Sequence, residues 1–319
     1  MQVDLTITCD EYLYVPQVCD DITLSIERRG TPSKLEFEVI RNDKMKLREG
    51  GIVSLIVDDT KIFYGYIFSL KYSESDTISV TAYDQLRYLK NKDTYVYEKK
   101  TASQVIKMIA DDFKLKCGKI CNTAYQISRV EDNQSLFDII ETALDETLRV
   151  QKKLYVFYDD YGKLTLKSID DMKRDDIVVT ADNTESYSLT STIDGETYNQ
   201  IKLFFDNEKT GKRDLYIEKD SSNIKKWGLL QYYEKLDKGE DGKAKAQALL
   251  KLHNHADRTL DFDGVTGVLG LRAGNSILFK LRVGDIELSH FLVIDKVKHH
   301  FSENEHTMDM TVIGGAIDG

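Results

Sequence analysis

The sequence predicts a mainly β protein of the α+β class, with two β-barrel domains, an inserted α+β module and a long helix interrupting the second barrel. Alternating apolar residues recur at roughly ten-residue intervals near both ends of the chain, which is typical of a small barrel or sandwich. Helical spacing replaces this alternation in the middle of the chain. The 18 Tyr and 2 Pro suit a β-rich chain, and Tyr also suits protein interfaces.

Residues 1–91 are predicted to form the first barrel. Their strands alternate apolar and polar residues and are separated by polar turns, among them Asp58–Thr60 and Ser73–Asp76. The apolar sets of the first strands are Val3, Leu5 and Ile7; Ile22, Leu24 and Ile26; and Leu35, Phe37 and Val39. Three further strands are expected between residues 52 and 83.

The stretch VTAYDQLRYLKN, residues 80–91, changes from strand to helical spacing without Gly or Pro. Asp84 is a good N-cap for a short helical turn. That turn is expected to place Leu86 and Leu89 against the open end of the first barrel. We therefore interpret the junction as structural: it is the point where the chain leaves the first barrel and enters the next module.

Residues 92–176 are predicted to form the inserted α+β module. Thr101 and Gln104 form a plausible capping box for a first helix, and Ser135 with Asp138 starts a second. A hairpin follows, with its turn at Asp159–Gly162.

Residues 177–319 are predicted to form the second barrel, interrupted by a helix at about 243–257. Arg48-Glu49-Gly50 and Arg272-Ala273-Gly274 each precede three alternating segments of similar length. The turn between the first and second segments of the later set is expected at Val283–Asp285. This correspondence predicts that residues 48–83 and 272–313 are equivalent strands of two similar domains.

The composition argues against several classes of protein. The net charge of −10 and pI near 5.2 leave no basic stripe to neutralise phosphates, so no specific nucleic acid is expected as a partner. No apolar run approaches the roughly 18 residues that span a bilayer. The Cys117-x3-Cys121 spacing fits neither a redox pair nor a zinc half-site.

Two histidine groups invite a chemical interpretation that their spacing does not support. The one-letter sequence of His253-Asn254-His255, HNH, is also the name of a nuclease family. The triplet lies near the predicted end of a helix, however, where His suits the helix dipole. His299 and His300 are neighbours on a strand and so point to opposite faces. His290 and His300 could share a face, yet with His306 nearby no further ligand completes a site. No metal and no cofactor are expected.

Acidic doublets leave one enzymatic alternative open. A cell-wall glycosidase needs two carboxylates across a cleft, and sequence alone does not exclude that arrangement. Most doublets fall in predicted turns or helix ends, where Asp caps and solubilises. The doublets begin at Asp20, Asp58, Asp111, Asp159, Asp170 and Asp175. We expect no enzyme activity and no catalytic, cofactor-binding or metal-binding residue, with a peptidoglycan hydrolase that uses paired carboxylates as the alternative.

Three stretches carry a family resemblance: VTAYDQLRYLKNKDTY, DDTKIFYGYIFSLKY and TYNQIKLFFDNEKTGKRDLYIEKDSSNIKKWGLLQ. They resemble the XkdQ/YqbQ family of baseplate hub proteins of contractile phage tails and phage-derived bacteriocins, which are similar to late control D proteins. The likeness covers nearly the whole chain. Some relatives add enzymatic or carbohydrate-binding segments, for which this chain is expected to have no room.

The resemblance implies two related barrels of tail-tube type in a structural, non-catalytic protein. Three chains with two barrels each would give six positions, matching a three-fold spike to a six-fold tail tube. The implied partners are further copies of the chain, the tail spike, the tail tube protein or tube initiator, and baseplate wedge proteins, without membrane binding of its own. The implied location is the bacterial cytoplasm during assembly and then the baseplate of a phage tail or tail-like particle.

Overall fold

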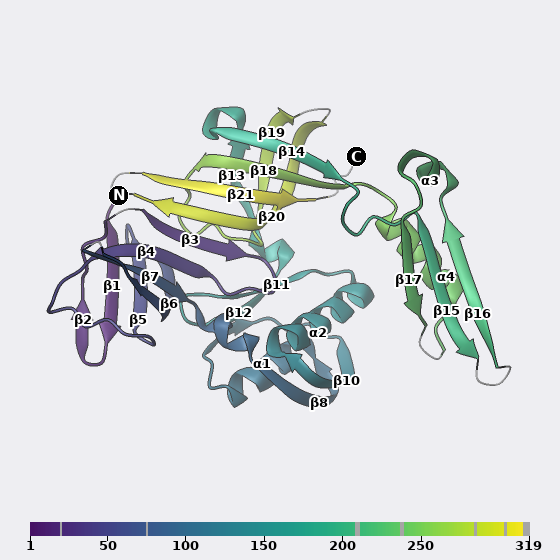
Figure 1. Ribbon diagram of the computed structural model, residues 1–319, viewed down its shortest axis with the longest axis horizontal. Coiled ribbons are helices and arrows are strands. Elements are labelled where there is room, and N and C mark those ends of the chain that lie inside the picture. Colours follow the sequence, from purple (N-terminus) through teal and green to yellow (C-terminus); the bar gives the residue numbers. More distant parts are fainter. Residues whose placement is uncertain are drawn as a thin grey trace. The chain divides into compact units, whose positions relative to one another are not determined.

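The computed structural model of the chain describes residues 1–19, 21–74, 76–207, 211–236, 239–283, 286–302 and 305–314. The protein is mainly β, as predicted (Figure 1). Its contacts divide it into two compact units: a large unit of residues 1–187 with 261–313, and a small unit of residues 188–260. Within the described residues, no helix has both the length and the apolar character needed to cross a bilayer.

The described part of residues 1–83 forms seven strands, and in most of them the side chains alternate between buried and partly exposed. In β1, Leu5 and Ile7 are buried, whereas Thr6 between them is only partly buried. This period of two is expected of strands that pack one face on a core. The strands are β1 (Val3–Cys9), β2 (Tyr12–Tyr14), β3 (Ile22–Glu27), β4 (Lys34–Ile40), β5 (Ile52–Val57), β6 (Thr60–Tyr72) and β7 (Thr77–Tyr83).

Later strands extend the same sheet. They are β13 (Lys173–Thr180), β14 (Ser186–Thr192), β18 (Asp257–Thr266), β19 (Ser276–Val283), β20 (Ile286–Phe301) and β21 (His306–Ile313). The sheet runs in the order β14–β18–β21–β20–β3–β4–β7–β6–β5–β1–β2, and β19 joins β13 to β20. A short 3-10 helix, η3 (Ala181–Asn183), lies between β13 and β14.

The two expected barrels correspond to an open sheet in the described part of the chain. The strand pairs there form a path that ends at β2 and β14, and none of them closes a barrel. A strand has only two edges, and β3 gives one to β4 and the other to β20. Ile22 lies opposite Phe301 and Glu27 opposite Lys296. Because both edges of β3 are paired, β3 joins the N-terminal strands to the later strands and does not close a barrel within the N-terminal strands.

The junction after β7 is the short helix η1 (Gln85–Lys90), and Asp84 is its N-cap, as predicted. One carboxylate oxygen of Asp84 accepts a hydrogen bond of 3.0 Å from the Leu86 N–H. Leu86 and Leu89 are buried, but in the core of the inserted module and not at the open end of a barrel. The apolar faces of the two module helices provide that core.

The inserted module packs two helices with short strands. Both predicted caps are confirmed: Thr101 and Gln104 form a capping box, and the Ser135 hydroxyl accepts from the Asp138 N–H. Leu136, Val105, Ile109 and Ile140 are buried in the shared core. The elements are β8 (Lys92–Thr101), α1 (Ala102–Asp112), β9 (Cys117–Ile120), β10 (Gln126–Ser135), α2 (Leu136–Gln151), β11 (Tyr155–Asp159), β12 (Leu164–Ser168) and η2 (Ile169–Met172).

The small unit has a sheet of its own, in the order β16–β15–β17. Sequence periodicity placed the Ile201–Phe205 strand in the second barrel, but β15 pairs only with β16 and β17 among the described strands. Ile201 and Leu203 are buried with Ala246 of α4, so one face of this sheet makes a separate core. The elements are β15 (Gln200–Asn207), β16 (Lys212–Lys219), α3 (Ser221–Trp227), β17 (Gln231–Lys235) and α4 (Gly242–His253).

Candidate functional site

The first candidate feature is a repeated meander, made of β5–β6–β7 and of β19–β20–β21. In the first meander the long strand β6 pairs with β5 up to Tyr66 and with β7 from Tyr66 onward. A bulge at Phe68 follows this change of partner. Gly50 N–H donates to the Ile67 carbonyl and Ile67 N–H donates to the Gly51 carbonyl, both at 2.8 Å.

The second meander repeats this arrangement. Strand β20 changes partner from β19 to β21 at Val293, and a bulge at Asp295 follows. Gly274 N–H donates to the Ile294 carbonyl at 2.7 Å, and Ile294 N–H donates to the Asn275 carbonyl at 2.9 Å. Strand order, point of exchange, bulge and turn contacts therefore agree between the two segments that the sequence pairs.

The turn before each meander has the same internal bond. Gly51 N–H donates to the Arg48 carbonyl at 3.2 Å, and Asn275 N–H donates to the Arg272 carbonyl at 3.0 Å. Gly50 and Gly274 have φ of 80° and 95°. Glycine adopts such positive φ without a steric penalty, which explains why the predicted motif keeps Gly at its third position.

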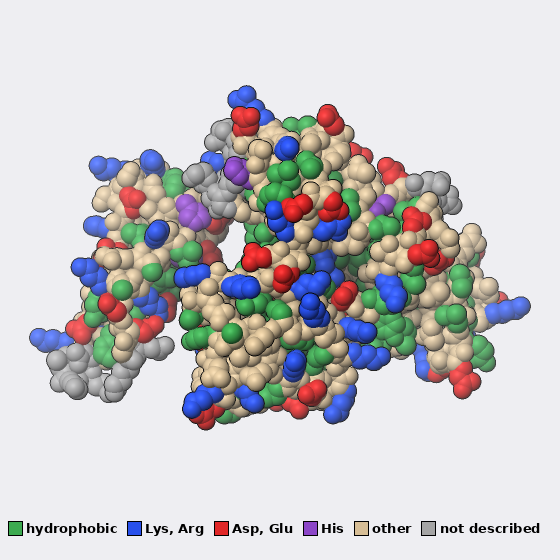
Figure 2. All heavy atoms as spheres, turned by 180° about the vertical axis from the view of Figure 1, so that it is seen from behind, with side chains coloured by type: hydrophobic (Ala, Val, Ile, Leu, Met, Phe, Trp, Pro, Cys, Tyr) green, Lys and Arg blue, Asp and Glu red, His purple; other side chains and the backbone are tan. Residues whose placement is uncertain are grey.

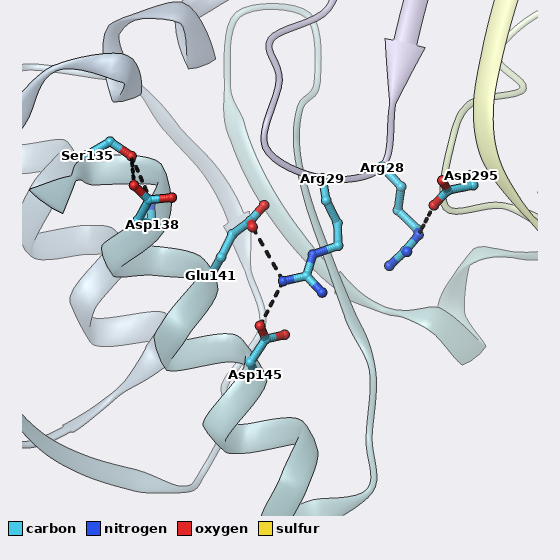
Figure 3. A network of polar contacts seen from close by, with 7 residues as sticks. All are labelled: Arg28, Arg29, Ser135, Asp138, Glu141, Asp145 and Asp295. Carbon is cyan, nitrogen blue, oxygen red and sulfur yellow. Dashed lines mark hydrogen bonds and ion pairs between the residues drawn. The ribbon is translucent and has the colours of Figure 1, made fainter. Parts of the chain in front are cut away.

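Consecutive arginines after β3 connect three parts of the large unit (Figure 3). Arg28 Nε donates to Asp295, the bulge residue of β20, at 2.9 Å. Arg29 points the other way, toward α2, and its Nη2 lies 2.9 Å from Asp145 and 3.4 Å from Glu141. The β3–β4 turn thus holds the second meander with one side chain and the inserted module with the next.

A buried polar cluster lies where these parts meet, around Asp84 and Asp159. Asp84 accepts from the N–H groups of Ser33 and Leu86, each at 3.0 Å. Asp159 accepts from Gln85 Nε2 and from the Gly162 N–H, each at 2.6 Å. These bonds connect the end of β7 to the β11–β12 turn and give each carboxylate two donors.

Arg272 contributes the positive charge of this cluster. Its Nη2 donates to the Asp159 carbonyl at 3.0 Å, and its guanidinium lies 3.8 Å from the centre of the Tyr158 ring. Its Nε is buried without a hydrogen-bond partner among the described residues. Stacking on an aromatic ring suits arginine because its planar guanidinium is weakly hydrated.

Burial shifts the pKa values of the three charged side chains of this cluster, Asp84, Asp159 and Arg272. Burial, followed by the charge of Asp159, raises the pKa of Asp84 to about 7. Burial also raises the pKa of Asp159 and lowers the pKa of Arg272. Two carboxylates that share one buried cation resist simultaneous ionisation, so their raised pKa values belong to the pair.

The buried carboxylates do not make the cleft that a glycosidase requires. The cavity beside Asp84, Asp159 and Arg272 has a volume of about 90 Å³. Ligand pockets usually measure about 300–1,000 Å³. Asp58 and Asp59 have positive φ in the β5–β6 turn, Asp111 and Asp112 end α1, and Asp20 lies outside the described residues. Asp170 and Asp171 lie in η2, whereas Asp175 and Asp176 lie within strand β13, where they pair with Lys173 and Arg174. Most of the described doublets therefore serve turns and helix ends, and the last one does not.

The histidines His253, His299, His300 and His306 make contacts within the fold. His299 and His300 point to opposite sides, as predicted: His299 contacts His306 and the Leu271 carbonyl, and His300 contacts Asp309. His253 ends α4. The described residues contain no group of three or more His, Cys, Asp or Glu that could hold a metal ion.

Sequence reasoning missed Gln85 and the burial of Arg272. Arg272 stands in the apolar stretch LGLRAG, and this context is the available signal for a buried arginine. Its counterpart Arg48 is exposed and paired with Asp10, so the repeated motif alone does not distinguish the two environments. On the face drawn in Figure 2, cationic and anionic side chains are interspersed.

This fold is similar to that of phage tail proteins. The 43 kDa tail protein of prophage MuSo2 from Shewanella oneidensis superposes with a TM-score of 0.70 at 11% identity, covering 99% of this chain and 100% of that one. The E. coli protein c3393, a type VI secretion component with structural similarity to the T4 tail proteins gp27 and gp5, gives 0.55 at 13% identity, covering 99% and 78%. The chain therefore has a fold that is found in phage tail proteins and in a type VI secretion component.

The chain belongs to the YQBQ-like family, whose model matches residues 22–313. It is 28% identical to the uncharacterized protein YqbQ of Bacillus subtilis (strain 168), over 93% of this chain and 92% of that protein. It is 26% identical to the phage-like element PBSX protein XkdQ of the same strain, with the same coverage. The resemblance inferred from the sequence is therefore confirmed.

Proposed function

We propose that the chain is the structural hub of a contractile-tail baseplate, a homotrimeric ring that adapts a three-fold spike to the six-fold tail tube. The repeated meander carries this proposal. Each chain offers two elements with the same strand exchange, bulge and turn bonds, so three chains offer six similar elements. Internal repetition in a closed three-fold ring produces pseudo-six-fold symmetry.

We propose that the two related halves are residues 1–91 and 177–319 and that residues 92–176 are an insertion. The first meander lies in the first half and the second meander in the second. The small unit is then a further insertion in the second half, larger than the helix that the sequence indicated. In this arrangement the shared β3–β20 edge fixes the two halves to each other within one chain.

The proposed partners are further copies of the chain, the tail spike, the tail tube protein or tube initiator, and baseplate wedge proteins. The chain would assemble in the bacterial cytoplasm and then remain in the baseplate. We propose no catalytic role, because the buried carboxylates bind backbone N–H groups and an amide around a cavity of about 90 Å³. The structural similarity of the chain to a phage tail protein and to a type VI secretion component supports its proposed place in a contractile machine.

A reconstruction of the intact particle tests this function. We expect three copies of the chain around the tail axis, about 110 kDa from three chains of 36.6 kDa, with the two meanders alternating around the ring. One copy or six copies would overturn the proposal. Zymography on cell walls tests the alternative, and clearing by the purified chain would establish a hydrolase.

A further inference from the structure

The small unit leaves one face of its sheet without a covering element among the described residues. Strand alternation sends Ile201 and Leu203 toward α4 and sends their neighbours, Lys202 and Phe204, to the opposite side. Figure 1 shows α4 on one side of β15 and β16. We call the opposite side the open face.

The centre of the open face is apolar and exposed. Leu215 and Ile217 of β16 are 51% and 50% exposed, and Tyr233 of β17 is 50% exposed. Cross-strand register places Leu215 opposite Phe204, and Lys202 lies between Ile217 and Tyr233. The rings of Phe204 and Tyr233 stack with centres 4.9 Å apart. Aromatic and aliphatic side chains at the centre of a polar rim are typical of protein interfaces.

The rim of this face is cationic. Among the described residues, the charged side chains of this face are Lys202 near its centre and Arg213, Lys219, Lys235 and the carboxylate Asp206 around it. Asp206 already binds Arg213 at 2.8 Å and Lys235 at 3.1 Å. The other carboxylates of these strands, Asp214, Glu218 and Glu234, alternate to the side of α4. The two sides of the sheet therefore carry opposite charge.

The charge of the whole chain indicates what covers this face. Residues 188–260 contain thirteen Lys and Arg against twelve Asp and Glu, a net charge of +1, so the rest of the chain carries a net charge of −11. A cationic rim around an apolar centre fits an acidic surface, because complementary charge steers and orients association.

We propose that the open face docks on the acidic large unit of a neighbouring copy of the chain. This inference rests on the proposed ring, since only a ring presents each copy with a neighbour in fixed orientation. The contact is heterologous: the open face of one copy meets a different surface on the next, and three such contacts close the ring.

Site-specific photocrosslinking in assembled particles tests the docking. Benzoylphenylalanine replaces Leu215, and the matched control carries it at Leu252 of α4, which is 61% exposed away from the open face. We expect a crosslinked product of two chains, twice 36.6 kDa, from position 215 and at least tenfold less from position 252. Peptide mapping should place the second crosslink site within residues 1–187 or 261–313.

A crosslink to another tail protein, a crosslink confined to a single chain, or no crosslink from position 215 would each overturn the docking. The copy number in the particle map separates this outcome from failure of the hub proposal, because three copies without the crosslink would leave the ring intact. As a second measurement, Leu215→Ser with Ile217→Ser should reduce particle yield about tenfold or more, whereas Leu252→Ser should not. Wild-type yield from the double variant would contradict the proposal.

Discussion

Ile67 and Ile294 occupy equivalent positions in two meanders that are more than 200 residues apart in the sequence. Each is buried, each exchanges two backbone hydrogen bonds with a glycine-containing turn, and each immediately precedes a bulge. A repeated set of backbone contacts with little shared side-chain identity indicates that geometry, and not a particular residue, defines the repeated element. This relationship explains why the sequence shows the repeat mainly through the short motif Arg-x-Gly that precedes each meander.

The two turn glycines give a matched stability test. Both have positive φ, which costs an L residue about 1–2 kcal/mol. A Cβ at Gly274 would also approach Val156 to 2.6 Å, whereas a Cβ at Gly50 meets nothing within 4 Å. We expect urea unfolding to show a larger loss of stability for Gly274→Ala than for Gly50→Ala. Equal losses would mean that the Val156 contact relaxes without cost.

The arginines after β3 should contribute unequally. The Arg28 side chain is 12% exposed and the Arg29 side chain 42% exposed. Arg28→Ala leaves Asp295 without its charged donor and is expected to cost about 1.5–3 kcal/mol. Arg29→Ala should cost less than about 1 kcal/mol, because exposed ion pairs are screened. A double-mutant cycle of Arg28 with Asp295 measures the coupling, and a coupling near zero would contradict this assignment.

The sequence predicted features that depend on neighbouring residues. The capping box at Thr101 and Gln104 and the N-cap at Asp84 are local, and both are present. The predicted destination of Leu86 and Leu89, the open end of the first barrel, was wrong, since the module core that receives them is assembled from α1 and α2 further along the chain. Periodicity shows that a residue is buried but not which element buries it.

Non-local strand pairing was the main feature beyond the reach of the sequence. The alternation in β3 is clear, yet its pairing with β20 joins residues more than 260 positions apart. Ile201, Leu203 and Phe205 gave the period of β15 but not its separate sheet. In the buried cluster, Asp84 was identified as a cap, whereas its association with Asp159 and Arg272 depends on the folded module.

The paired histidines should remain neutral in mildly acidic solution. Burial and the neighbouring His306 lower the pKa of His299 to about 3, and burial lowers the pKa of His306 to about 4. The Leu271 carbonyl can only accept, so His299 Nε2 donates to it and His299 Nδ1 accepts from His306 Nε2. NMR should show both ring signals unchanged between pH 8 and 5, whereas the urea-unfolded chain should titrate near pH 6.5. Titration of either ring near pH 6.5 in the folded protein would contradict the buried pair.

The same histidines should make folding stability fall in acid. Both pKa values are depressed on folding, so the unfolded chain binds more protons below about pH 6.5. Their contribution is therefore complete above that pH and is lost as the pH falls toward 4 and 3. Urea unfolding between pH 7 and 4 measures this loss, and stability that rose on acidification over the whole range would oppose it.

Asp84 should produce the opposite pH dependence. Its pKa is raised to about 7 by burial and by Asp159, so the folded chain holds a proton that the unfolded chain has released above about pH 4. The stability that this proton provides is present at low pH and is lost as the pH rises through 7. Asp84→Asn keeps an oxygen that can cap η1 and removes the titration, so the difference in stability, wild type minus variant, should fall as the pH rises from 4 to 8. Asp220→Asn, at the N-cap of α3, is the control of opposite sign, because hydrogen bonds from Asn254 and from backbone N–H groups lower the pKa of Asp220. Urea unfolding at five pH values compares the three proteins, and parallel curves for wild type and Asp84→Asn would show that Asp84 carries no buried proton.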